Sequence, residues 1–592
     1  MSFFQELKRR NVFRVAVAYI IVSWLLLQVG DTLGPALYLP EWFQSGVAYV
    51  LILGFPVAII FAWAFELTPE GVKRERDVDR TQSITGRTGQ KLNVTIIALL
   101  VVAVGYLALD KFVLDHDHEE VVLTTGEPSI AVLPFTNMSD DASNEFFADG
   151  ITEELLNLLA KIPELEVTSR TSAFQFKGKN IDIPTVAEQL NVEHVLEGSV
   201  RKSGVKVRIT AQLINAATDK HVWSETYDRE LDDIFAIQDE IARKVVDELH
   251  VTLLGEAPSA RQTDTEAYAL YLEGLYYMDL DGPEQWPRAK ELFEKALEID
   301  PDYAPAWFGK AQAIREMANW GNYDIAEGSA LARQWSEHAL KLDPTLTEAW
   351  ALLAHLKLIY DWDWVEAENL VEKALESGPK HPAAMAEAAR LAQTQGRLDD
   401  AEQYYFAALA VDPLSNTRIR EAGIASWWLQ DYSRAEELFR KNEELYPSAA
   451  WPGDLVATLI MQGRYDEAVE LTEKIRMNPD LSEAAQEYIY NFVRAYSFPY
   501  VERYAEGAEG RDWIIEDRGA ALSYQVAEMY AQVGDSDKAF EWLDTGFDYH
   551  DGGMTYLLVD PWLTSLHDDA RWRPLLEKMN MLEYWDAMPG RN

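Results

Sequence analysis

A proline recurs at nearly constant spacing through the second half of the chain, and this period constrains the fold more than any other feature. The intervals are 43, 35, 34 and 34 residues, and the prolines are Pro301, Pro344, Pro379, Pro413 and Pro447. An alanine stands twelve residues before each, at Ala289, Ala332, Ala367, Ala401 and Ala435. Small residues let two helices approach closely and proline ends a helix, so the spacing predicts a stack of paired helices.

This pattern resembles the tetratricopeptide repeat, whose period is 34 residues. It predicts an α-solenoid over residues 267–480, followed by degenerate repeats and a C-terminal cap over 481–592. Residues 482–518 show no regular pattern, whereas 534–547 resemble one more second helix. Such stacks curl into a superhelix with a concave groove that commonly holds peptides or protein segments.

Tryptophans in the repeats are the candidates for partner binding. Trp307 and Trp350 occupy consensus aromatic positions, so we expect them to pack between helices. Trp362 and Trp364, in the sequence DWDW, are equally consistent with packing and with a binding surface, because exposed aromatic residues mark binding sites. We therefore take Trp362 and Trp364 as the candidate partner-binding residues.

Three long apolar runs lie near the N-terminus, at about 15–33, 46–65 and 92–112. Runs of this length predict three transmembrane helices in a membrane domain over 1–115. Lys and Arg precede the first run and fill the loop before the third, while the loop between the first two has none. By the positive-inside rule we expect a bacterial inner-membrane protein with a cytoplasmic N-terminus and periplasmic C-terminal domains.

Residues 116–127 and 255–266 are predicted to be linkers. His116 and His118 lie in the first linker, in DHDHEE, where a metal site is an alternative to a plain acidic linker. We favour the linker, because no other cluster of ligands is near. The chain has no cysteine, which excludes disulfides, thiolate metal sites and cysteine nucleophiles.

Residues 128–254 alternate between strand and helix patterns. We expect strands over 129–138, 166–170, 194–201, 206–215 and 222–227, with helices over 146–162, 183–190 and 234–254. Gly204 lies in the turn between two of the strands. Together these strands and helices predict a small mixed sheet with helices packed on it.

The segments SIAVLPFTNMSDD, VLEGSVRKSG and VRITAQLINAATDKHVWSETYDRELDDIF resemble the TolB-like (FlgO-like) N-terminal domain of bacterial repeat proteins. The block ELKRRNVFRVAVAYIIVSWLLLQVGDTL resembles the membrane segment of the same architectures. The resemblance implies a cell-envelope binding domain with no established chemistry. Some relatives carry a cyclase domain, but we find no cyclase metal-carboxylate motif in this sequence.

Charge excludes one class of partner. The formal net charge is -45, of which residues 1–91 contribute +2 and the remainder -47. The acids are dispersed, so a solvated surface explains them better than a dedicated site for basic ligands. A body this acidic repels phosphate backbones, so nucleic acid is not expected as a partner.

Catalytic candidates are few. Ser169, Thr171 and Ser172 lie at a strand end with no histidine that the sequence places beside them, so a nucleophilic triad has no support. Asp140, Asp141, Glu145 and Asp149 suit the start of a helix better than acid–base chemistry. We predict no catalytic residue, cofactor or metal, and expect that the protein is not an enzyme.

Together these patterns predict a multidomain, mainly α protein with three transmembrane helices, a small α/β mixed-sheet domain and an α-solenoid. The expected function is a non-catalytic, membrane-anchored scaffold or sensor that binds protein or peptide partners, with a homo-oligomer left open. The alternatives are an accessory subunit of a signalling enzyme, such as a nucleotide cyclase, and an unrecognised hydrolase.

Overall fold

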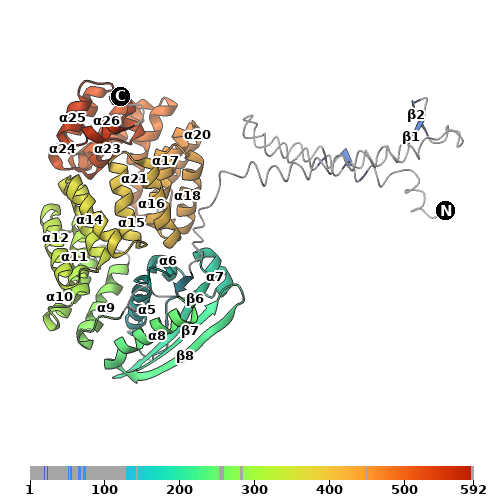
Figure 1. The fold of residues 1–592 in the computed structure, drawn as a ribbon. Helices are drawn as coiled ribbons and strands as arrows, with labels where there is room; N and C mark the ends of the chain where they lie inside the picture. The colour runs from blue at the N-terminus through green and yellow to red at the C-terminus, as the bar shows by residue number, and fades with distance from the viewer. Residues whose placement is uncertain are drawn as a thin grey trace. The chain divides into compact units, whose positions relative to one another are not determined.

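The computed structural model describes residues 128–588 apart from 140, 142–143, 252–258, 281–283, 448–450 and 480. Of the N-terminal part it describes 65–68, 71–74 and the single residues 16, 19, 23, 51, 54 and 55. The chain divides into two compact units, Met1–Leu123 and Thr124–Asn592. Figure 1 shows the helices and strands of the second unit.

The membrane part of the expected fold class was wrong. No helix among the described residues is both long and apolar enough to cross a bilayer. Phe65, the last residue of the second expected span, instead begins strand β1 (Phe65–Thr68), which pairs with β2 (Gly71–Arg74). The two strands are antiparallel, and the register places Phe65 opposite Arg74 and Thr68 opposite Gly71. The rest of the three expected spans lies almost wholly outside the described residues, as do His116 and His118.

The second unit begins with a mixed sheet in the strand order β5-β3-β6-β7-β8, with β4 paired to β6. The strands are β3 (Ser129–Val132), β4 (Thr136–Asn137), β5 (Glu166–Val167), β6 (His194–Ser203), β7 (Lys206–Asn215) and β8 (Lys220–Glu230). Strand β3 runs parallel to β5 and β6, whereas β6, β7 and β8 are antiparallel. Gly204 has a φ of 62°, which lets the chain turn between β6 and β7.

Helices cover both faces of the sheet around β3 (Figure 1). They are α5 (Glu145–Ala160), α6 (Arg170–Phe174), α7 (Ile183–Leu190) and α8 (Ile234–Glu248). Successive residues of β3 point to opposite faces, so Ile130 joins the core under α5 and α8 while Ala131 packs with α7. Asp182 caps α7 by accepting a hydrogen bond from Thr185 N, and Pro184 occupies its first turn.

The rest of the unit is an array that contains eight helix pairs within the described residues. The first helices are α9 (Thr265–Asp279), α11 (Ala304–Asn319), α13 (Thr347–Leu356), α15 (Pro382–Thr394), α17 (Asn416–Trp428), α19 (Pro452–Met461), α21 (Glu483–Ser497) and α23 (Ser523–Gln532). The second helices are α10 (Trp286–Ile299), α12 (Ile325–Leu342), α14 (Trp364–Ser377), α16 (Leu398–Val411), α18 (Tyr432–Leu445), α20 (Tyr465–Ile475), α22 (Tyr504–Arg518) and α24 (Ser536–Tyr549). The pair α21–α22 occupies the stretch that shows no regular sequence pattern.

The periodic small residues lie where the helices meet. The five alanines that precede the prolines are all fully buried. Asn442 replaces alanine in one repeat, and its Nδ2 donates to Asn416 Oδ1 at 2.8 Å. Trp307 and Trp350 each donate from Nε1 to the carbonyl of the proline six residues earlier, at 2.8 and 2.9 Å. Both tryptophans therefore pack within the repeats, as expected.

The sheet domain contacts the array at the first helix pair and again at the α16–α17 turn. Helix α5 packs on α9 so closely that a Cβ at Gly150 would lie 2.5 Å from the Leu272 side chain. Helix α6 meets the α16–α17 turn, where Ser172 Oγ donates to Asp412 Oδ1 at 2.6 Å and accepts from Leu414 N at 2.8 Å. The domain thus touches the first helix pair and a turn well over 100 residues further along the chain.

The C-terminal segment follows α24 as η8 (Gly552–Tyr556), η9 (Pro561–Leu566), α25 (Trp572–Lys578) and α26 (Leu582–Ala587). It packs into a core with residues of α13, α14, α15 and α23. The ring of Tyr556 lies 5.5 Å from that of Trp428, and the ring of Trp562 lies 5.8 Å from that of Trp427. The segment therefore contacts middle repeats as well as the last one.

Candidate functional site

A row of charged side chains crosses four successive first helices, from α13 to α19. We call it the first-helix row, and it consists of His355, Glu387, Arg390, Arg418, Arg420, Glu421 and Asp454. These helices end in short turns before their partners, so equivalent positions stack from one repeat to the next. In repeat stacks the first helices line the concave surface, which makes this row the candidate site.

The row is linked from helix to helix by ion pairs. His355 Nδ1 lies 3.2 Å from Glu387 Oε1. Arg390 donates from Nε to Glu387 at 3.3 Å and from Nη2 to Glu421 at 3.1 Å. Arg418 also pairs with Glu421. Each arginine therefore holds a carboxylate in a fixed position, and the signs alternate along the row.

The pairs are largely buried, and only a small part of each side chain is exposed. The side chains of Glu387, Arg390 and Glu421 are 11, 16 and 13% exposed. Although burial would raise the pKa of Glu387, the charges of His355 and Arg390 lower it to about 2. Glu387 is thus charged at neutral pH, and its carboxylate lies beside the arginines of the row.

The row continues onto α19. Arg420 donates from Nη2 to Asp454 Oδ1 at 3.1 Å, and its side chain is 42% exposed. The other basic side chains of the row are 16–18% exposed, so Arg420 is the most exposed of them. It is therefore the basic side chain best placed to contact a partner.

A second ion pair lies beside the row, at the N-terminal ends of α13 and α15. Ala383 N donates to His381 Nδ1 at 3.3 Å, so the hydrogen of a neutral ring lies on Nε2, which is 3.4 Å from Glu348 Oε1. Burial would raise the pKa of Glu348, but the charge and hydrogen bond of His381 lower it to about 2. The negative charge of Glu348 also affects the pKa of Glu154 on α5. Burial is the main reason that this pKa is raised to about 7; Lys161 lowers it in part, and Glu348 raises it further.

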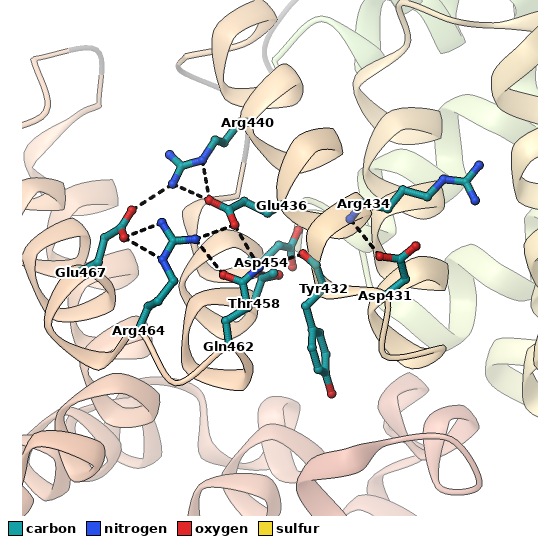
Figure 2. A network of polar contacts seen from close by, with 10 residues as sticks. All are labelled: Asp431, Tyr432, Arg434, Glu436, Arg440, Asp454, Thr458, Gln462, Arg464 and Glu467. Atoms are coloured by element: carbon teal, nitrogen blue, oxygen red, sulfur yellow. Dashed lines mark hydrogen bonds and ion pairs between the residues drawn. The ribbon is translucent and has the colours of Figure 1, made fainter. Parts of the chain in front are cut away.

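A different network joins the second helices α18 and α20, and Figure 2 shows it. Arg464 pairs with Glu436 at 2.7 Å and with Glu467, while Arg440 pairs with the same two carboxylates at 2.7 and 3.0 Å. Gln462 Nε2 donates to Glu436 at 2.9 Å. The two arginines and two glutamates compensate one another, so we interpret this network as a clamp between repeats.

The candidate partner-binding tryptophans are buried. Trp362 is 8% exposed, and its ring stacks on His550 at 4.5 Å. Trp364 is 4% exposed, and its Nε1 donates to Met579 O at 2.8 Å. Both side chains contact the C-terminal segment of the same chain, which favours the packing interpretation over the binding surface.

The candidate nucleophiles Ser169 and Ser172 have structural hydrogen-bond partners, and among the described residues none of these partners is a histidine. Ser169 caps α6, and Ser172 is bound to Asp412 and Leu414. Asp149 is buried and pairs with Lys177. In the described part of the chain, no group of three or more histidine and acidic side chains is arranged to hold a metal ion.

The sequence analysis missed the first-helix row, although the sequence contains a signal for it. Arg420 and Asp454 are 34 residues apart, His355 and Glu387 are 32 apart, and Arg390 and Glu421 are 31 apart. Opposite charges separated by about one repeat occupy neighbouring positions in a stack. A search for such pairs on first helices would have found them.

Comparison with known families gives a separate match for each of the two parts of this unit. Residues 126–244 match the family model for the HilA/YgeH-like transcriptional regulator, second domain. Residues 361–422 match a tetratricopeptide-repeat model. The expected TolB-like assignment is not supported by these matches, whereas the repeats are.

One similar curated protein is the "Putative adenylate cyclase 3" of Rhizobium meliloti (strain 1021). It is 44% identical over 188 residues, which are 30% of this chain and 31% of that protein. The matched region is thus about a third of the length of this relative.

Solved structures with similar helix pairs include the human IFIT1 dimer with m7Gppp-AAAA and PilW, a type IV pilus biogenesis factor. The first is 16% identical and covers 53% of this chain and 77% of its own, with a TM-score of 0.35. The second is 19% identical and covers 38% and 98%, with a TM-score of 0.30. The family match and the stacked helix pairs together make the C-terminal part a tetratricopeptide-repeat array, which is a protein-interaction scaffold.

Proposed function

We propose that the first-helix row binds an extended segment of a partner protein that carries charges of both signs. The observation that carries this proposal is the alternation of Glu387, Arg390, Glu421 and Arg418 along consecutive first helices. An extended segment with alternating charges could exchange these internal pairs for pairs with its own side chains. Such electrostatic matching supplies specificity more than affinity.

Charge reversal on the row tests the proposal. Tagged full-length protein is used to capture partners from a bacterial lysate, as wild type and as Arg420→Glu. Arg420→Glu should reduce the recovery of row-dependent partners by about fivefold or more, since it places a repelling charge at an exposed contact. Raising the salt concentration should weaken the wild-type interaction, because exposed ion pairs are screened.

The matched control is Arg440→Glu, which reverses an arginine of similar exposure (47%) in the second-helix network. This variant should capture the same partners as the wild type. An identical loss in both variants would show that the row has no specific role, and an unchanged pattern with Arg420→Glu would reject the proposal.

A second candidate is an accessory role beside a nucleotide cyclase, and the name of the curated relative favours it. The purified chain would be assayed with ATP and Mg²⁺, alone and with a candidate cyclase. Stimulation of the cyclase would support the accessory role, and cyclic AMP formed by the chain alone would make the protein an enzyme. The expected periplasmic location is untested and stays a prediction.

A further inference from the structure

A cavity of about 450 Å³ opens between the end of α20, α21 and α22. The residues that line it include two arginines, two glutamates and two aromatic residues: Arg476, Arg494, Glu483, Glu487, Tyr490 and Trp513. The cavity is away from the first-helix row, and its lining shares no residue with the row. It therefore requires an explanation of its own.

The charges around this cavity do not neutralise one another by direct contact. Within the described residues, Arg476, Glu483 and Glu487 form no ion pair. Nearby arginines behave differently, since Arg503 pairs with Glu473 at 3.0 Å and also with Glu506 at 2.6 Å. Positive and negative side chains therefore line the same cavity without forming ion pairs with one another.

Arg494 is held in place but keeps unused donor capacity. Its side chain is 15% exposed, and its Nη1 lies 3.7 Å from Glu509, which is 68% exposed. Its Nε is buried and has no hydrogen-bond partner among the described residues. A buried donor that lacks an acceptor is costly, so the described residues do not satisfy this guanidinium group fully.

Aromatic rings fix the basic side of the cavity. Arg476 and Arg494 lie over the Tyr490 ring, with guanidinium carbons 4.7 and 5.3 Å from its centroid. Trp513 provides a further ring at the wall. Gln486 Nε2 donates to Asn478 O at 2.7 Å, which ties the wall to the preceding loop. These contacts preorganise the two guanidinium groups before any ligand arrives.

We propose that this cavity binds a small zwitterionic molecule of the amino-acid or short-peptide class. Arg476 and Arg494 receive its carboxylate, and Glu483 and Glu487 receive its ammonium group. Guanidinium groups match a carboxylate through two parallel hydrogen bonds, which favours this assignment over a simple anion. Tyr490 and Trp513 pack against the apolar part of the molecule. This site does not rest on the function proposed for the row.

Thermal shift and calorimetric titration of the full-length protein test the site with four probes. The probes are phenylalanine, the tripeptide alanyl-phenylalanyl-alanine, its N-acetylated form and its C-amidated form. Phenylalanine or the unblocked tripeptide, or both, should raise the melting temperature. Whichever binds more tightly shows whether the site prefers a free amino acid or a peptide. Each blocked form should bind about tenfold more weakly, since each loses one charged contact.

Substitutions assign the two ends of the ligand. Arg476→Gln should weaken the unblocked ligand about tenfold but leave the weaker C-amidated form unchanged, because that form has no carboxylate to lose. The double variant Glu483→Gln with Glu487→Gln should weaken the unblocked ligand about tenfold but leave the weaker N-acetylated form unchanged, because that form has no ammonium group to lose. All three residues are exposed, so these variants should fold. Arg440→Gln, which lies outside the cavity, should bind like the wild type.

Two results would overturn the site. One is the absence of any thermal shift or heat of binding with phenylalanine and the tripeptide at about 10 mM, a concentration at which even weak binding would be detected. The other is equal binding by the wild type and Arg476→Gln. Unchanged partner capture by Arg420→Glu would reject the proposal for the row but leave this site unaffected, so the two proposals fail separately.

Discussion

At the scale of single residues, protonation of Glu154 makes the stability of the fold depend on pH. Its pKa is about 7 in the folded chain against an ordinary value of 4.5, chiefly because of burial. The folded state thus binds this proton more tightly than the unfolded state between these two values. The free energy of unfolding should therefore fall as the pH rises from about 4.5 to about 7.

Glu154→Gln, which mimics the protonated acid, should raise the free energy of unfolding at pH 8 by about 1–3 kcal/mol. At pH 4.5 the variant and the wild type should unfold alike. Urea denaturation at the two pH values measures both. Glu188→Gln on α7 is the control, since that side chain is exposed. An equal effect of Glu154→Gln at both pH values would contradict the assignment.

At the scale of elements, the Ser172–Asp412 contact ties helix α6 of the sheet domain to the α16–α17 turn of the array. Ser172 is fully buried, and its hydroxyl both donates to Asp412 and accepts from Leu414 N. Ser172→Ala leaves the Leu414 N–H without this acceptor, and that should cost about 1–3 kcal/mol. The first effect should be earlier exposure of α6 and the α16–α17 turn.

Hydrogen exchange with mass spectrometry would detect this local change, as faster exchange in peptides that cover residues 169–176 and 411–418. Ser203→Ala at the exposed end of β6 is the control, and it should exchange like the wild type. Unaltered protection of both regions in Ser172→Ala would show that the contact carries little of the coupling between domain and array.

Elements with a strong local pattern could be predicted from the sequence, and contacts between distant segments could not. The strand over 206–215 and the helix over 183–190 follow from alternation and from a capped helix start. The α21–α22 pair lacks the consensus alanine and proline, so its repeat was not recognised. Trp362 and Trp364 stayed ambiguous because their partners, His550 and Met579, are about 200 residues away in the chain.

The same limit applied to the N-terminal part and to the candidate site. A hydropathy window counts Phe65 into an apolar run, whereas in the structure Phe65 pairs with Arg74, which lies beyond that run. The first-helix row could have been found from its spacing, because repeats turn sequence period into spatial contact. The cavity at Arg476 could not, since it depends on how α22 packs against α21.

At the scale of the whole molecule, the C-terminal segment closes the array on itself. Trp562 lies 5.8 Å from Trp427 of α17, 6.0 Å from Tyr496 of α21 and 6.3 Å from Tyr500, measured between ring centroids. A single side chain thus bridges repeats that are far apart in the sequence. Ring contacts of this kind contribute beyond the area that they bury.

Trp562→Ala should therefore lower the free energy of unfolding by about 3 kcal/mol, and the loss should spread beyond the segment itself. Hydrogen exchange should quicken in peptides from α17 and α21 as well as in residues 552–566. Trp320→Ala removes a tryptophan that is 67% exposed and should change little. If exchange quickened only within 552–566, the segment would be a terminal cap alone. Faster exchange in α17 would instead mean that the groove of the middle repeats keeps its shape because the end of the chain holds it.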